Sequence, residues 1–267
     1  MSLRNLLCAI LTSITGPAFA QTQIDDPSEL NSFVVVGAAA LPEFEGADRL
    51  RAVPLIVSRF SLLDSEVEIE GLEGRVDLIR DPVWRAGPAI GVVLPRNENI
   101  ADTAEIVALP DVDVAAEIGA FAGFRIPFGS LREGTLTGTA TVRHDVAGSH
   151  NGLTVDSELE YFFAVNRMLR IGVSANASFA TNDYFDTYFS IDADGSAASG
   201  LAQSDAGGGA RDVGLEIYSI LSFSKRWGVF SRLSYNRLLG DAENSPIVQD
   251  AGSADQFFVG TGLFFRF

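Results

Sequence analysis

The sequence has 267 residues, with 19 Lys and Arg against 35 Asp and Glu, so its formal net charge is −16. So acidic a chain is a poor partner for nucleic acid, whose phosphates need a basic surface. Beyond residue 20 no run of about 18 apolar residues occurs, which excludes an ordinary transmembrane helix from that part of the chain.

The N-terminus has the pattern of a secretory signal peptide. Arg4 precedes an apolar run over residues 6–14, and a small-x-small motif ends at Ala20. The run is too short to cross ~30 Å of hydrocarbon as a helix. We therefore expect residues 1–20 to be removed and residues 21–32 to form a polar periplasmic lead-in.

From residue 33 onward, apolar residues alternate with polar ones. In the segment 212–224, Leu215 and Ile217 share one face, whereas Gly214 and Glu216 fall on the other. This period of two is typical of strands with one apolar and one polar face. The alternation predicts strands at 33–41, 51–60, 64–70, 72–80, 84–94, 114–126, 134–145, 153–165, 168–180, 212–224, 227–238 and 256–267.

The connections between these strands alternate in length. Every second one is long, apart from the turn at Gly71, and those between them are short. Long loops on one side and short turns on the other are typical of bacterial outer-membrane β-barrels. The longest loop, 181–211, is rich in Gly, Ala, Ser and Asp, and should be mobile unless it folds into the barrel mouth.

The pattern predicts an all-β fold, an antiparallel up-and-down transmembrane β-barrel of about 12 strands over residues 33–267 in a Gram-negative outer membrane. The chain ends on Phe267, and the last strand would close the ring against the first, with its terminal aromatics at the periplasmic interface. The alternative is a soluble barrel with its apolar face inward. The glycines and the charged side chains on the second face, together with the asymmetric connections, argue against it.

Four stretches resemble the MipA/OmpV family of outer-membrane proteins. They are PEFEGAD at 42–48, AEIGAFAGFR at 116–125, NDYFDTYFSIDADGSAASGL at 182–201 and NRLLGDAENSPIVQDAGSADQFF at 236–258. The family's namesake is a scaffold that brings a murein-degrading lytic transglycosylase together with a bifunctional penicillin-binding protein. The resemblance therefore implies a non-enzymatic scaffold whose partners are outer-membrane lipid, a lytic transglycosylase and a penicillin-binding protein. It supplies no catalytic residues.

Charged residues recur on the face that would line the lumen. They could form a constriction that selects ions, which would make the protein a narrow channel. They could instead pair with one another and plug the lumen, and we favour this interpretation because side chains can largely fill so narrow a pore. The lumen-facing candidates are Glu117, Arg125, Glu158, Glu160, Arg170, Glu216, Arg232 and Arg266.

Basic residues fall in the predicted periplasmic turns of this acidic protein. A partner with an acidic patch could dock on them. Alternatively, basic turns merely suit the membrane surface. The candidates are Arg132, Arg167, Lys225 and Arg226.

Three motifs invite a catalytic or ligand-binding interpretation that we do not favour. RHDVAGSHNG at 143–152 contains Ser, His and Asp, but a triad is recognised by its geometry and its oxyanion donors. DADG at 192–195 lacks the further ligands of a calcium loop, and DAGGGARD at 205–212 lacks the Lys-Ser/Thr of a phosphate loop. Cys8, the only cysteine, would leave with the signal peptide. We predict no enzymatic activity, no metal and no cofactor.

Overall fold

The computed structural model describes residues 32–129 and 134–267. The expected signal peptide, most of the expected lead-in and Arg132 lie outside these ranges.

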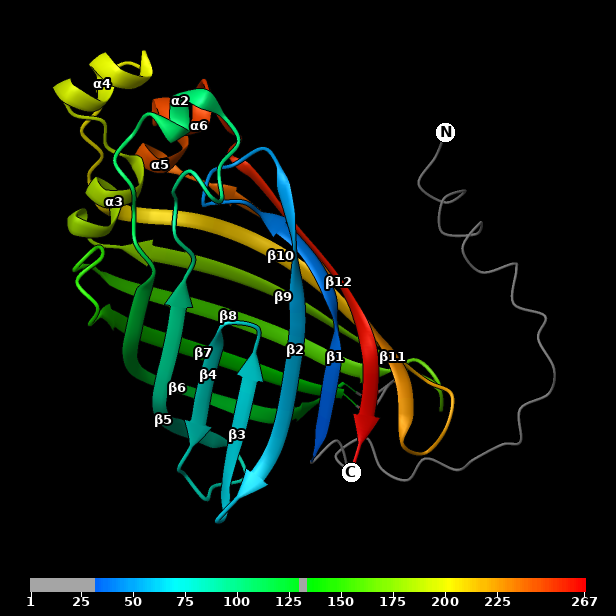
Figure 1. Ribbon diagram of the computed structural model, residues 1–267. Helices are drawn as coiled ribbons and strands as arrows, with labels where there is room; N and C mark the ends of the chain where they lie inside the picture. Colours follow the sequence, from blue (N-terminus) through cyan, green and yellow to red (C-terminus); the bar gives the residue numbers. More distant parts are fainter. Residues whose placement is uncertain (1–31, 130–133) are drawn as a thin grey trace.

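In the described ranges, twelve antiparallel strands close into one barrel (Figure 1). Each strand pairs with its neighbours in sequence, and the first pairs with the last. The strands are β1 (Phe33–Pro42), β2 (Leu50–Leu62), β3 (Ser65–Glu70), β4 (Glu73–Asp77), β5 (Trp84–Val93), β6 (Ala115–Phe128), β7 (Gly134–Asp145), β8 (Leu153–Ala164), β9 (Leu169–Ala180), β10 (Gly209–Ser222), β11 (Trp227–Leu238) and β12 (Asp255–Arg266).

This topology confirms the predicted barrel, with small differences at the strand ends. Strand β10 begins at Gly209 rather than at 212, because Gly209 and Ala210 already pair with the end of β9. Strand β4 ends at Asp77 rather than at 80, because the Asp77 carboxylate accepts a hydrogen bond from the Ile79 backbone N–H and the chain turns there.

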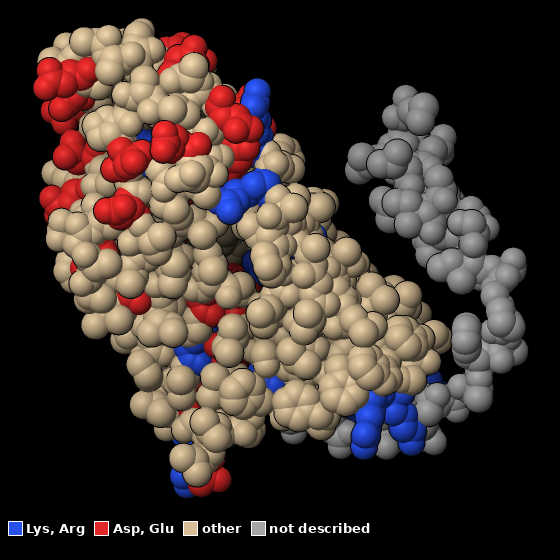
Figure 2. All heavy atoms as spheres, viewed as in Figure 1, with Lys and Arg blue, Asp and Glu red and all other residues tan. Residues whose placement is uncertain are grey.

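The two ends of the barrel differ in structure and in charge. The long loops carry the helices α2 (Ala104–Val107), α3 (Asn182–Phe189), α4 (Ala193–Ser199), α5 (Gly240–Asn244) and α6 (Pro246–Gln249). They gather at one end, and the short turns lie at the other (Figure 1). Acidic side chains dominate the loop end, basic side chains gather at the turn end, and uncharged side chains cover the wall between them (Figure 2). We assign the turn end to the periplasm, as in other outer-membrane barrels.

The long loops pack on one another and form a lid with an apolar interior. Phe44 from the β1–β2 loop, Ile106 from α2, Ile191 from the β9–β10 loop and Ile247 from α6 belong to one buried cluster. A second cluster contains Phe185 and other residues of α3. The 181–208 loop is therefore folded into this lid. In the described residues, none of the helices is long and apolar enough to cross a membrane.

The barrel closes where β1 meets β12. Phe33 lies opposite Arg266, and the pairing continues to Ala40 opposite Val259. The Phe267 backbone N–H extends the seam by donating to the Ser32 carbonyl at 3.2 Å. The rings of Trp227 and Phe265 lie 4.5 Å apart at this periplasmic end, where aromatic side chains form an interfacial girdle.

The wall is lower at the β3–β4 hairpin than elsewhere (Figure 1). The hairpin turns at Gly71, whose φ of +60° suits glycine. Strand β2 pairs with β3 only over Val57–Leu62, so residues 50–55 pair with β1 alone. The edge of β2 above the hairpin is therefore free.

The two faces of β10 allow the orientation of the wall to be tested. Leu215 is 64% exposed on the outer face, whereas Glu216 pairs with Arg232 in the lumen. We predict that Leu215→Arg destabilises the folded barrel by about 2–4 kcal/mol, because it places a charge in hydrocarbon. Glu216→Gln should cost less than half of this. Urea titrations of both variants in lipid bilayers would measure the difference, and equal losses would contradict the assigned orientation.

The seam gives a second prediction. Deleting Leu263–Phe267 removes the pairs that join the periplasmic ends of β12 and β1 and exposes their backbone groups to lipid. We expect the truncated chain to be absent from the outer membrane of a Gram-negative host. Phe267→Ala, which keeps the backbone pairing, should still insert. Membrane fractionation and gel mobility with and without heating would distinguish these outcomes, and normal insertion of the truncated chain would refute the role of the seam.

Candidate functional site: the lumen

The lumen is lined by charged side chains that the alternation of the strands turns inward. Glu66 on β3 lies 3.2 Å from Arg125 on β6, three strands away, and this contact is possible only across the interior. Along each strand, the residues that alternate with these inward-facing ones point to the outer face. The lumen is thus polar where the outer wall is apolar.

The periplasmic half of the lumen contains a network centred on Glu68, whose side chain is 8% exposed. Arg59 lies 2.7 Å from Glu68, and Arg75 also bonds to it. Arg85 lies 2.6 Å from Glu66 and 2.9 Å from Asp77. Buried charges remain stable only when they are paired and hydrogen-bonded, and this network pairs arginines from β2, β4, β5 and β6 with carboxylates of β3 and β4.

Apolar side chains occupy the rest of this half. The Arg59 guanidinium lies 6.0 Å from the centre of the Phe33 ring, so the two groups are adjacent. Together the Glu68 network and the apolar cluster occupy the periplasmic half of the lumen with buried and half-buried side chains, and we call them the lumen plug. The apolar members are Phe33, Val35, Ala39, Leu55, Ile220, Phe230 and Phe264.

A second charged network lies nearer the lid. Arg143 on β7 pairs with Glu117 at 3.1 Å, Glu73 at 3.0 Å and Asp156 at 2.7 Å. Arg211 on β10 pairs with Asp156 at 3.3 Å, and so links this network to the loops.

The loop residue Glu45 completes the link between the wall and the lid. Its carboxylate lies 3.3 Å from Arg211 and accepts a hydrogen bond from the Tyr184 hydroxyl of α3. Burial raises the pKa of Glu45 despite the opposing effect of Arg211, and burial followed by the Glu45 charge raises the pKa of Tyr184. These contacts hold α3 over the barrel mouth.

Several predicted lumen residues belong to these networks. Glu117 pairs with Arg143, and Arg125 pairs with Glu66 and Glu68. Glu216 lies 2.6 Å from Arg232, which also bonds to Glu70.

The other four candidates have different surroundings. Glu160 accepts a hydrogen bond from the Tyr218 hydroxyl at 2.9 Å, and Arg266 lies opposite Phe33 in the seam. In the described ranges, no arginine lies within ion-pair distance of Glu158, and the Nε of buried Arg170 has no hydrogen-bond acceptor. A functional role for these eight residues stays a prediction.

The residues at the centres of the networks were not among the sequence candidates. Glu66, Glu68, Arg85, Arg143 and Arg211 each bond to two or more charged partners. The alternation of Glu66, Glu68 and Glu70 with apolar residues placed them on one strand face, and this signal could have identified them. Their partners on other strands required the register.

The described residues of two of the three motifs make local hydrogen bonds. The Ser149 hydroxyl donates to the Asp113 carbonyl at 2.8 Å, and His150 Nδ1 accepts from the Gly152 backbone N–H at 3.0 Å, so no Ser–His bond forms. Asp192 caps α4 by accepting from the Gly195 N–H at 2.7 Å. Among the residues that the structure describes, no group of three or more His, Cys, Asp or Glu is placed to hold a metal ion.

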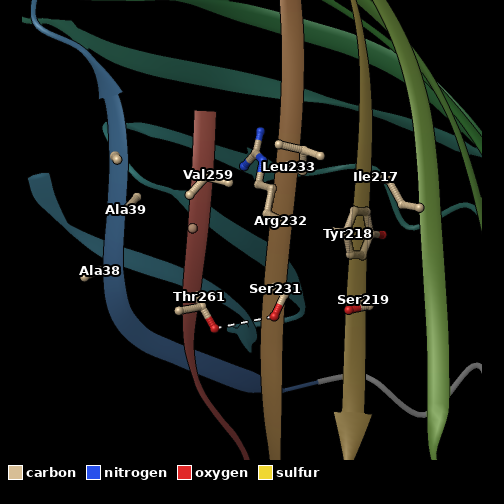
Figure 3. A pocket seen from close by; sticks show the side chains of 12 residues that line it. Ala38, Ala39, Ile217, Tyr218, Ser219, Ser231, Arg232, Leu233, Val259 and Thr261 are labelled. Atoms are coloured by element: carbon tan, nitrogen blue, oxygen red, sulfur yellow. Dashed lines mark hydrogen bonds between the residues drawn. The ribbon is translucent and has the colours of Figure 1, made fainter. Parts of the chain in front are cut away.

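One hollow of the described residues lies inside the barrel and another lies on its outer face. A chamber of about 850 Å³ lies in the lumen above the plug and is lined by charged residues of both networks. A groove of about 660 Å³ crosses β1, β12, β11 and β10, where Ile217, Leu233 and Val259 border smaller Ala, Ser, Thr and Gly residues (Figure 3). In this groove the Ser231 and Thr261 hydroxyls lie 3.4 Å apart.

Comparisons with known proteins agree with an outer-membrane barrel. The family model of MltA-interacting protein MipA matches residues 34–267. No curated protein matches the sequence.

Solved structures show only distant likeness to the chain. It is similar to OmpT, an outer membrane protein of Vibrio cholerae, with 8% identity and a TM-score of 0.37, covering 79% of this chain and 60% of that one. A bacterial polysaccharide outer membrane secretin shares 8% identity with a TM-score of 0.39, covering 89% and 98%. Pseudomonas aeruginosa OccK11 (OpdR) shares 8% identity with a TM-score of 0.32, covering 88% and 94%. The chain thus spans less than two thirds of the OmpT length.

The lumen plug gives a prediction about stability. Glu68→Gln removes one charge that is shared by Arg59, Arg75, Arg85 and Arg125. Arg75 then has no carboxylate within ion-pair distance among the described residues, whereas Arg59, Arg85 and Arg125 keep Glu66, so we expect a loss of about 1.5–3 kcal/mol of folding free energy. Asp64→Asn breaks the 2.8 Å pair with Arg80 on an exposed turn, and should cost less than about 1 kcal/mol. Equal shifts of the urea midpoint for the two variants would contradict the importance of the plug.

Proposed function

We propose, from the premise that the chain belongs to the MltA-interacting protein MipA family, that this outer-membrane barrel is a non-enzymatic scaffold for murein enzymes. Its periplasmic end would dock a lytic transglycosylase, and a penicillin-binding protein would join the same assembly. The family name supports the first of these partners, since it describes an interaction with MltA.

The observation that carries the proposal is the lumen plug. A protein that transports solutes needs a continuous path, whereas here the Glu68 network and the Phe33 cluster occupy the periplasmic half of the lumen. A scaffold needs no path, but it needs a rigid surface at the membrane. A barrel whose periplasmic half is occupied by side chains and cross-linked by ion pairs meets that need.

The periplasmic surface also suits a protein partner. Arg167, Lys225 and Arg226 are exposed in the turns, and basic side chains gather at this end of an acidic protein (Figure 2). An enzyme with an acidic patch would be oriented by them through an attraction that salt weakens. The competing explanation is that these turns contact anionic lipid.

A narrow channel is the second candidate. The chamber above the plug favours it, because charged walls around a space of about 850 Å³ could admit small solutes. The plug opposes it, since movement of paired side chains would be needed before a solute could cross.

The scaffold proposal predicts the effect of neutralising the basic turns. Replacing Arg132, Arg167, Lys225 and Arg226 by Gln should leave the barrel folded and weaken capture of a purified lytic transglycosylase about tenfold or more, as charge complementarity is lost. Capture by immobilised barrel, measured at low and high salt, would test this.

A matched control neutralises exposed acidic residues at the other end of the barrel. Glu98→Gln, Asp102→Asn and Glu105→Gln alter loops on the extracellular side and should not affect capture. If the unmodified barrel captures no transglycosylase at any salt concentration, the scaffold proposal is wrong.

A further inference from the structure

The chamber above the plug opens through the wall of the barrel rather than only toward its ends. Its lining runs from Glu158 on β8 to Ile56, Leu72 and Val92, which are exposed on the outer face around the tip of the β3–β4 hairpin. At this height the space-filling view shows a hollow in the wall, with charged side chains visible inside (Figure 2). We call it the lateral opening.

The backbone of β2 explains why the opening persists. The Ile56 carbonyl accepts a hydrogen bond from the Gly71 N–H, so the backbone groups of Ile56 face β3. The backbone groups of every second residue in a strand point toward the same neighbouring strand. The backbone groups of Pro54 and Ala52 therefore also point toward the β3 side of β2, but the hairpin has ended before it reaches them. Pro54 has no N–H to leave unpaired, which suits a free edge. The other backbone N–H and C=O groups on this edge of β2 would be costly to leave unpaired in hydrocarbon, and they need water or a ligand as a partner.

The wall opposite the opening offers hydrogen-bond acceptors. The register places Glu158, Asn176, Gly214 and Asn236 in one row across β8, β9, β10 and β11. The Oδ1 atoms of both asparagines are buried and have no donor in the part of the chain that the structure describes, and both lie over Gly214, which has no side chain. In the described ranges no arginine lies within ion-pair distance of Glu158, although the Ser174 hydroxyl and the charge of Arg75 act on its carboxylate. We call Glu158, Asn176 and Asn236 the acceptor row.

A buried side chain from the lid also points to a ligand. Tyr188 of α3 is 3% exposed and lines the same chamber, and its hydroxyl has no hydrogen-bond partner among the described residues. Buried polar atoms are nearly always satisfied, so unpaired groups around one cavity indicate that water or a ligand occupies it. The chamber is lined by nine carboxylates and six arginines, and this excess of negative charge favours a cation.

From these observations we propose that the chamber binds a cationic amphiphile, which enters from the outer leaflet through the lateral opening. Its amine would donate to Glu158, Asn176 and Asn236, since an ammonium group has three donors and no acceptor. Its apolar chain would remain between Ile56, Leu72 and Val92, in contact with lipid. This proposal is independent of the scaffold function, because it concerns the extracellular half of the barrel.

The head-group site can be tested with dansylcadaverine, a fluorescent amphiphilic amine, titrated into the barrel in phosphatidylcholine nanodiscs with empty nanodiscs as background. We expect saturable binding that dodecylamine displaces and dodecanoate does not. Glu158→Gln and the double variant Asn176→Leu/Asn236→Leu should each weaken binding at least tenfold. Glu105→Gln, an equal charge change on an exposed loop, should leave it unchanged.

Two results would overturn the head-group assignment. One is equal displacement by dodecylamine and dodecanoate from the unmodified barrel, a measurement that needs no variant to fold. The other is unchanged affinity in the Glu158→Gln variant, once gel mobility without heating shows that it is folded.

The route can be tested separately by blocking the opening. In a chain whose Cys8 is replaced by Ser, Leu72→Cys introduces a thiol at the hairpin tip, and a polyethylene glycol maleimide attached there would cover the opening. We expect association of dansylcadaverine to slow at least tenfold. The same label on Leu63→Cys, which is 88% exposed in the turn at the other end of β3, should have no effect. Unchanged association with the label at residue 72 would exclude entry through the wall.

Discussion

The structure depends on one constraint, which is that backbone N–H and C=O groups in hydrocarbon must be paired within the protein. Closure of β1 against β12 meets it, and the seam is tight. Gly37 lies opposite Gly262, and a Cβ on Gly37 would collide with the backbone of β12. The absence of side chains there lets the first and last strands approach closely enough to pair. The edge of β2 above the β3–β4 hairpin is where the constraint is relaxed, and there the chamber reaches the outer face.

Closure of the barrel separates the lumen from the lipid, so the side chains that point inward are in a different environment from those that point outward. Side chains that alternate with the lipid-facing residues must fill a narrow space without leaving unpaired charge. Arginine suits this role because its planar guanidinium can bond several carboxylates at once, as Arg143 does with Glu73, Glu117 and Asp156. Lysine would supply a single compact charge. The periplasmic half thus becomes a cross-linked plug, and the extracellular half keeps a chamber whose charges are only partly paired.

The sequence predicted the wall better than it predicted the interior or the lid. Alternation located the strands because one face meets lipid, and even the short β3–β4 hairpin at Gly71 was found. The sequence predicted that the 181–211 loop would be mobile unless it folded into the barrel mouth. Its short helix α4, with sequence ADGSAAS, shows no apolar periodicity that would have predicted a packed helix. The order of the lid comes from contacts between loops distant in sequence, such as Ile106 with Ile191.

The lumen candidates show the same limit. Residue parity identified Glu117 and Arg125 as inward-facing, but it could not show that Arg143 or Glu68 would be their partners, because pairing depends on register and on contacts across the interior. Glu158 was a candidate on the same grounds as Glu216, yet only the fold distinguishes the carboxylate with an arginine partner from the one without. Local sequence specifies which way a side chain points, and the tertiary structure specifies what it meets.

The central claim is that paired charges and apolar side chains fill the periplasmic half of the lumen and block the passage of solutes through it. Electrical recording of the purified barrel in planar lipid bilayers tests it most directly, with a porin in the same bilayers as the positive control. The account predicts no steady conductance at neutral pH in concentrated KCl. Stable, stepwise conductance from the unmodified barrel would contradict it and would favour the narrow channel.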